Sequence, residues 1–179
     1  MFLYLGPRLQ RGPVCGLVSL VVVSRLLGRE TSTDLLLQTA RERGFTLQGE
    51  MFSVWHMAQL AEDVLQTEVR VEAAERLEDT RWLVRLLRGG GCVLLPYDCA
   101  PDSSVCLADG HRAHWGVVTG LVAPTSSPPA PASVVLAEAP GCRLLQAGED
   151  LADMEDECGR SVRLIVRQSK STELAVYSR

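Results

Sequence analysis

A cysteine near the N-terminus has the neighbours of a catalytic thiol. Cys15 follows Gly12 and Pro13, and proline in the first turn of a helix presets φ and lacks the N–H that would be left unbonded there. The sequence therefore predicts Cys15 in a first helical turn, where the partial positive charge of the helix end favours a nucleophilic thiolate. Gly16 is expected to leave room beside the sulfur for the backbone of a substrate.

An amide side chain lies close enough in sequence to assist such a nucleophile. Gln10 precedes the Gly-Pro turn, which can fold it back beside the sulfur. Its amide N–H groups, with the backbone N–H of Cys15, could hold the negatively charged oxygen of a tetrahedral intermediate. The pattern therefore predicts attack on a carbonyl, with Gln10 as the oxyanion donor. The opposing interpretation is that Cys15 is a small buried apolar residue, as free cysteines usually are.

A thiolate nucleophile needs a base, and the chain has 3 histidines. His114 opens the Val-rich segment 114–120, and a side chain at the start of a strand can face a cleft while its backbone is held in place. His56 falls within a predicted helix, and His111 lies in a polar loop. His114 is therefore the predicted base, with Trp115 as a possible shield against water.

A third side chain usually holds the imidazole of a cysteine peptidase in its useful tautomer. Two candidates stand at the ends of predicted strands, Glu138 after 134–137 and Gln168 after 162–166. The sequence does not decide between them, and both stay open.

Zinc binding is the main alternative for these residue types. The cysteines and histidines between positions 92 and 114 follow the spacing C-x6-C-x6-C-x4-H-x2-H, with Cys92, Cys99, Cys106, His111 and His114 as its members. Structural zinc sites favour two to four residues between paired ligands. We therefore predict no metal and no other cofactor.

The composition favours one globular domain over residues 1–179. The net charge of −4 provides no basic field for nucleic acid, and the 6 cysteines lack the spacing of a compact disulfide scaffold. The apolar run 14–23 behind Arg8 and Arg11 imitates a signal peptide, but it is too short to span a bilayer. The Gly12-Pro13 pair indicates a helix start there instead. We expect a cytoplasmic protein without a membrane segment, and secretion stays open.

The first half of the chain predicts helices and the second half predicts strands. The expected helices cover 14–27, a segment from a Thr31 cap to Gly44, a segment capped by Ser53, and a segment from Asp79 or Thr80 to Gly89. The expected strands cover 69–71, 92–95 before Pro96, 114–120, 134–137, 162–166 and 174–177. Segment 98–112 is expected to be a surface loop, and the Pro/Ser-rich segment 123–133 to lack packed structure. This order predicts an α+β domain with N-terminal helices packed against an antiparallel sheet.

Four segments of the chain resemble one known family, the actin maturation proteases. The most distinctive is ERGFT at 42–46 followed by QGEMFSV at 48–54. The others are the nucleophile segment 8–18, LLPYD at 94–98, and the base segment 110–115. Segment 162–171 looks like a late strand of the family. The resemblance implies a cysteine peptidase with a papain-like or bacteriocin-processing-peptidase-like fold.

Within this resemblance, Cys15 corresponds to the nucleophile, His114 to the base and Gln10 to the oxyanion donor. The implied activity is that of a cytoplasmic aminopeptidase that removes the acetylated N-terminal residue of immature actin. Arg8, Arg11 and Arg112 flank the predicted site and could attract the acidic residues that begin an actin chain.

Family members can carry a Pro-rich N-terminal extension thought to engage profilin, but this chain begins almost at the nucleophile segment. The resemblance therefore gives little support to profilin docking by that route.

Two further interpretations stay open beside the actin-processing peptidase. One alternative is a truncated, catalytically weak relative that binds actin or another partner through the same cleft. Another is a cysteine hydrolase or transferase of the same fold that acts on a different acyl group.

Overall fold

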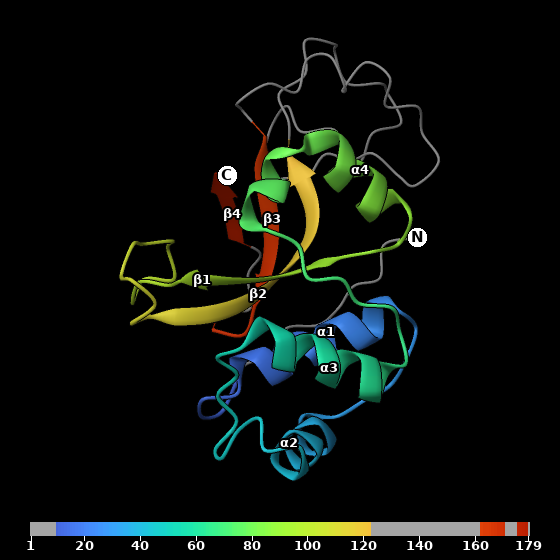
Figure 1. Ribbon diagram of the computed structural model, residues 1–179. Coiled ribbons are helices and arrows are strands. Elements are labelled where there is room, and N and C mark those ends of the chain that lie inside the picture. The colour runs from blue at the N-terminus through green and yellow to red at the C-terminus, as the bar shows by residue number, and fades with distance from the viewer. Residues whose placement is uncertain (1–9, 123–161, 171–174, 179) are drawn as a thin grey trace.

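The computed structural model describes residues 10–122, 162–170 and 175–178 (Figure 1). Helices come first and strands later: α1 (Cys15–Leu26), α2 (Thr33–Glu42), α3 (Val54–Leu65), the 3-10 helix η1 (Ala74–Glu78), α4 (Thr80–Arg88), β1 (Val93–Asp98), β2 (Ala113–Val122), β3 (Arg163–Gln168) and β4 (Ala175–Ser178). The predicted α+β class is confirmed. The predicted strand 134–137, the segment 123–133 and Glu138 lie outside the described residues.

Helix α1 is buried on nearly every side, as its apolar sequence predicts. It packs with α2, α3 and β2 in one hydrophobic cluster. Its two buried hydroxyls are both satisfied, because Ser19 donates to the carbonyl of Trp115 at 3.2 Å and Ser24 donates to that of Val21 at 2.8 Å. None of the helices described within 10–122 has the length and hydropathy of a membrane span.

Side chains cap the next helices. Ser53 accepts from the N–H of His56 at 3.3 Å at the start of α3, which confirms the predicted cap. Helix α2 begins one residue later than predicted, and its cap is Ser32 instead of Thr31. The Ser32 hydroxyl accepts from the N–H of Leu35 at 3.1 Å. Serine and threonine both serve at this position, so the sequence alone did not distinguish the two neighbours.

The sheet has the strand order β1-β2-β3-β4, and every neighbouring pair is antiparallel. Adjacent residues of a strand face opposite sides of the sheet. Val117 of β2 accordingly packs in the cluster of α1–α3, while its neighbour Val118 packs with Val166 and with Leu83 of α4. Helices α1–α3 therefore cover one face of the sheet and α4 covers part of the other (Figure 1).

Two strand predictions are wrong. The first predicted strand, 69–71, pairs with no other strand of the described residues. Strand β1 does not end before Pro96 but continues to Asp98, with Pro96 opposite Trp115. It lies at the edge of the sheet, where proline is tolerated because its missing N–H can face outward.

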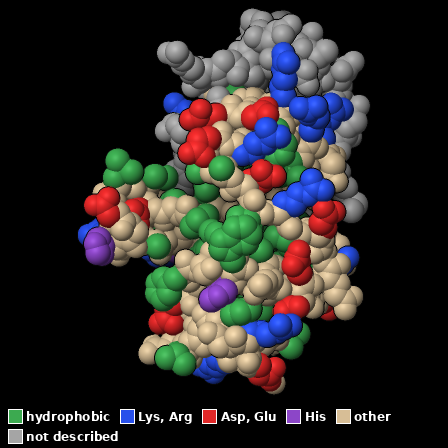
Figure 2. Space-filling model, in the orientation of Figure 1, with side chains coloured by type: hydrophobic (Ala, Val, Ile, Leu, Met, Phe, Trp, Pro, Cys, Tyr) green, Lys and Arg blue, Asp and Glu red, His purple; other side chains and the backbone are tan. Residues whose placement is uncertain are grey.

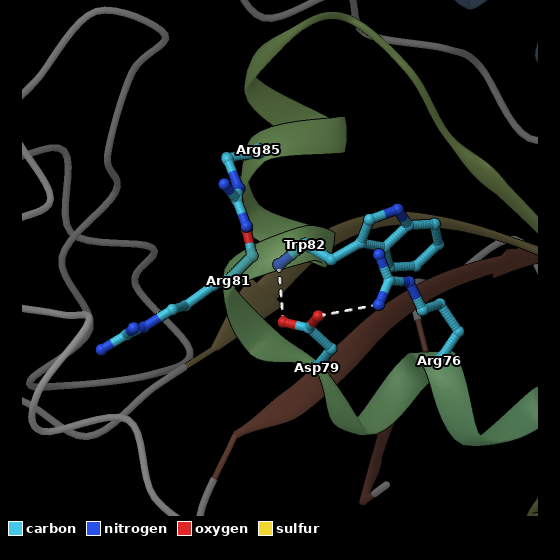
Figure 3. Close-up of polar contacts among 5 residues, drawn as sticks. All are labelled: Arg76, Asp79, Arg81, Trp82 and Arg85. Atoms are coloured by element: carbon cyan, nitrogen blue, oxygen red, sulfur yellow. Dashed lines mark hydrogen bonds and ion pairs between the residues drawn. The ribbon is translucent and has the colours of Figure 1, made fainter.

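The start of α4 is fixed by a polar cluster (Figure 3). Asp79 accepts from the N–H of Trp82 at 2.9 Å and forms an ion pair with Arg76 at 3.1 Å. The Arg76 guanidinium lies 5.3 Å from the centre of the Trp82 ring. Asp79 is one of the two predicted starting residues, and it ties η1 to α4.

Candidate active site

Cys15 is the first residue of α1, as predicted, and is half-buried. Val14 occupies the cap position and offers no side-chain acceptor, and the first turn contains no acidic side chain. The N–H groups at this helix end therefore have no capping side chain. Their partial positive charge is available to stabilise negative charge on the Cys15 sulfur.

The residue after Cys15 packs against the residue after His114. A Cβ atom on Gly16 would lie 3.1 Å from Cδ1 of Trp115 and 3.1 Å from Cβ of Met51. The Trp115 indole N–H donates to the carbonyl of Met51 at 2.7 Å. Gly16 of α1 and Trp115 of β2 are therefore in contact. Cys15 directly precedes the first of them in the sequence, and His114 directly precedes the second.

This packing corrects the expectation for Gly16. The residue is buried, and its missing side chain admits Met51 and Trp115 instead of a substrate backbone. Trp115 is 5% exposed, and its ring lies within the contact between α1 and β2.

His114 is 1% exposed, and its Nε2 has no hydrogen-bond partner among the described residues. The pKa of His114 is lowered to about 4, first by burial and second by the positive charge of Lys170, while a hydrogen bond with Gln168 acts in the opposite direction. The imidazole is therefore neutral at pH 7. The free Nε2 is the atom that can take a proton from a nucleophile.

Gln168 and Tyr97 hold the His114 ring. Because Nε2 has no partner, Nδ1 is the ring atom that forms the hydrogen bond with Gln168. The Tyr97 hydroxyl donates to Oε1 of Gln168 at 3.4 Å, and the Tyr97 ring meets His114 edge to face at 5.7 Å. Gly116 makes room for this arrangement, since a Cβ there would lie 3.2 Å from the Tyr97 ring and 2.6 Å from Val166. Of the two candidates for the third residue, Gln168 is the one within the described chain.

Gln10 is held by Ser169, the residue after Gln168. The backbone N–H of Gln10 donates to the carbonyl of Ser169 at 3.0 Å, and the Ser169 hydroxyl donates to Oε1 of Gln10 at 2.5 Å. Nε2 of Gln10 donates one hydrogen to the carbonyl of Gly12 at 3.0 Å. An amide nitrogen has two hydrogens, so one hydrogen of Gln10 is not used by this bond. Sequence reasoning missed Ser169, although its position beside Gln168 was a signal.

The loop before His114 is organised by Asp98, which sequence reasoning also missed. The Asp98 carboxylate accepts backbone N–H groups of Ala108 at 2.9 Å, Gly110 at 3.0 Å and Arg112 at 3.2 Å. Hydrogen bonds from Gly110 and Ala108 lower the pKa of Asp98. Asp98 therefore fixes the path of the chain into β2.

The other histidines lie where the sequence predicts. His56 is in the first turn of α3 and stacks on Phe45 with ring centres 4.4 Å apart. His111 is exposed in the loop between β1 and β2. Burial raises the pKa of the Cys92 thiol to about 11.

Comparison with known proteins gives the family. A family model described as "Actin maturation protease-like, C-terminal domain" matches residues 5–122. The chain belongs to this family. The match contains Gln10, Cys15 and His114, and it ends before Gln168.

Several relatives are named actin maturation protease. The protein of Danio rerio is 39% identical over 122 residues, which cover 66% of this chain and 40% of the relative. That of Xenopus tropicalis is 34% identical over 181 residues, covering 97% of this chain and 57% of the relative. The human protein is 39% identical over 117 residues, covering 64% of this chain and 33% of the relative. The chain thus spans from a third to somewhat over half of the length of these proteases. No solved structure matches it.

Proposed function

We propose that this chain is a single papain-like peptidase domain in which Cys15 is the nucleophile, His114 the base and Gln10 the oxyanion donor. The observation that carries the proposal is the buried Nε2 of His114 without a partner. A buried polar atom without a hydrogen bond is costly, and a catalytic role is one of the explanations for such an atom. The contact of Gly16 with Trp115 brings the start of α1 close to the start of β2, although Trp115 and His114 are neighbours in β2 and face opposite sides of the sheet.

The proposed reaction proceeds in two halves. Nε2 of His114 takes the proton of the Cys15 thiol, and the thiolate attacks the carbonyl carbon of the peptide bond. The Cys15 N–H and the second amide hydrogen of Gln10 stabilise the oxyanion. The imidazolium then gives its proton to the leaving amine. Water, deprotonated by the neutral His114, hydrolyses the remaining thioester and regenerates the thiol.

Gln168 acts as the residue that orients the base in this proposal. Its Oε1 accepts from Nδ1 of His114, which leaves the lone pair on Nε2. Formation of the Cys15 thiolate would raise the low pKa of His114, since an opposite charge nearby favours the protonated ring. The neutral resting state and the protonated intermediate are thus both accounted for.

The proposed substrate is the acetylated N-terminus of immature actin, cleaved by aminopeptidase action in the cytoplasm. The names of the relatives support actin as the substrate. The test is to incubate the full chain with N-acetylated actin and to read the mass of the actin N-terminal peptide. We expect a loss that corresponds to one acetylated residue, and none with Cys15→Ala.

The control is the folded state of the Cys15→Ala variant, read from its urea unfolding curve. Equal processing by the folded variant would refute Cys15 as the nucleophile. A chain that binds actin without cleaving it would instead be the binding module.

A further inference from the structure

The start of α3 and the loop before it enclose the residue that follows the proposed nucleophile. A Cβ atom on Gly16 would lie 3.1 Å from Cβ of Met51 and 3.2 Å from Sδ of Met57. Both methionines are buried, while Cys15 and Val54 are partly buried and pack against the same hydrophobic cluster. Helices α1 and α3 therefore begin side by side (Figure 1), and the loop that enters α3 lies next to the start of α1.

Two aromatic side chains of this region are largely exposed. Phe52 is 85% exposed and Trp55 is 65% exposed. Phe52 directly precedes Ser53, the cap of α3, and an apolar residue in that place often packs against the fourth residue of the helix. Here the fourth residue is Met57, which is buried beside Gly16. A ring that is 85% exposed makes little of that contact, so the described residues cover little of it.

The exposure of the two rings fits a protein partner better than a small ligand. A small ligand is usually bound in a concave pocket that covers most of its surface, whereas these rings project from the surface. Protein interfaces bury such projecting aromatic side chains as anchors in hollows of the partner. Figure 2 shows hydrophobic side chains at the surface around α3, with charged side chains beside them. An apolar centre with a polar surround is the usual composition of an interface.

We propose that Phe52 and Trp55 form a docking surface for an apolar patch on the folded body of the polypeptide substrate, outside the terminal residues that reach Cys15. The inference rests on the proposed peptidase function and names the form of substrate that the site takes, a folded protein in preference to a free peptide. Through Met51 and Met57, this surface is continuous with the candidate active site. A protein docked there holds its own terminus at a high local concentration beside the sulfur.

The test compares two substrates with the same N-terminus, monomeric N-acetylated actin and an N-acetylated peptide of its first residues. Replacing Phe52 and Trp55 together by Ala should raise KM for the folded substrate by about tenfold with kcat unchanged, because an anchor of the docked complex is lost. KM for the peptide should not change. Leu107→Ala, which removes a fully exposed apolar side chain from the loop between β1 and β2, is the matched control and should leave both values unchanged.

Two results would overturn the inference while leaving the peptidase function intact. One is a KM for folded actin that the double variant leaves unaltered. The other is a KM for the peptide that rises as far as that for folded actin, because the rings would then contact the terminal residues and not the folded body.

A second measurement does not depend on cleavage. The Cys15→Ala chain is titrated with monomeric N-acetylated actin in a calorimeter, with and without the two aromatic side chains. We expect their removal to raise Kd by about tenfold and to make the heat-capacity change of binding less negative, since less apolar surface is buried. Binding that needs both rings, by a native chain that cleaves neither substrate, would refute the peptidase function and retain the docking surface. An equal Kd with and without the rings would contradict the docking surface.

Discussion

Replacing His114 by Asn should make the stability of the protein less dependent on pH. The folded protein holds the His114 pKa at about 4, while an unfolded histidine titrates near 6.5. Between these values the unfolded chain binds more protons, so stability rises with pH through this window and is lost as the pH falls. From pH 7 to pH 5, this linkage removes about 2 kcal/mol from the free energy of unfolding.

The assay is urea unfolding of the native chain and of His114→Asn at pH 7 and pH 5. Comparing the two proteins cancels the contributions of Asp98 and the other carboxyl groups, which titrate in both. We expect the native chain to lose about 2 kcal/mol more than the variant over this interval. Equal losses would show that His114 is exposed or protonated in the folded state, and the description of it as a neutral base would then be wrong.

Three further substitutions test the parts around the base and the nucleophile. Gln168→Ala should lower kcat by about tenfold or more with little change in KM, because the His114 ring loses the hydrogen bond that fixes its tautomer. Measured pH–rate profiles would detect this loss, and an unchanged kcat would contradict it. Ser169→Ala should lower kcat by a few-fold in the native background but have no effect in Gln10→Ala, since it acts through Gln10; additive losses would contradict that route. Gly16→Ala should destabilise the fold by about 1–3 kcal/mol through overpacking, measured by urea unfolding; a neutral result would mean that α1 and β2 can separate without cost.

The helices were predictable because their signals are local. The buried helix α1 and the caps Ser53 and Asp79 follow from residue types within one or two turns. The cap of α2 was misplaced by one residue, because Thr31 and Ser32 offer the same hydroxyl. The α+β class followed from the order of helices and strands alone.

The features that the sequence predicted wrongly or missed are those decided by contacts between distant segments. Whether Pro96 ends a strand depends on whether that strand lies at an edge, which only the pairing of β1 with β2 decides. The role of Gly16 is set by Trp115, and that of Ser169 by Gln10. The candidate pair Cys15 and His114 could be selected from sequence because each has a local signal, a helix start and a strand start. Gln168, which bonds to His114, comes from another strand, and Asp98 acts on the loop between β1 and β2.

The most direct test of the account is the rate at which iodoacetamide alkylates each cysteine of the native chain at pH 7, read by peptide mass spectrometry. An activated Cys15 should react much faster than Cys92, whose pKa of about 11 keeps it protonated. Its rate should fall toward that of an ordinary thiol in His114→Ala. Similar slow rates at all cysteines, or a Cys15 rate that is the same without His114, would contradict the proposed nucleophile and base.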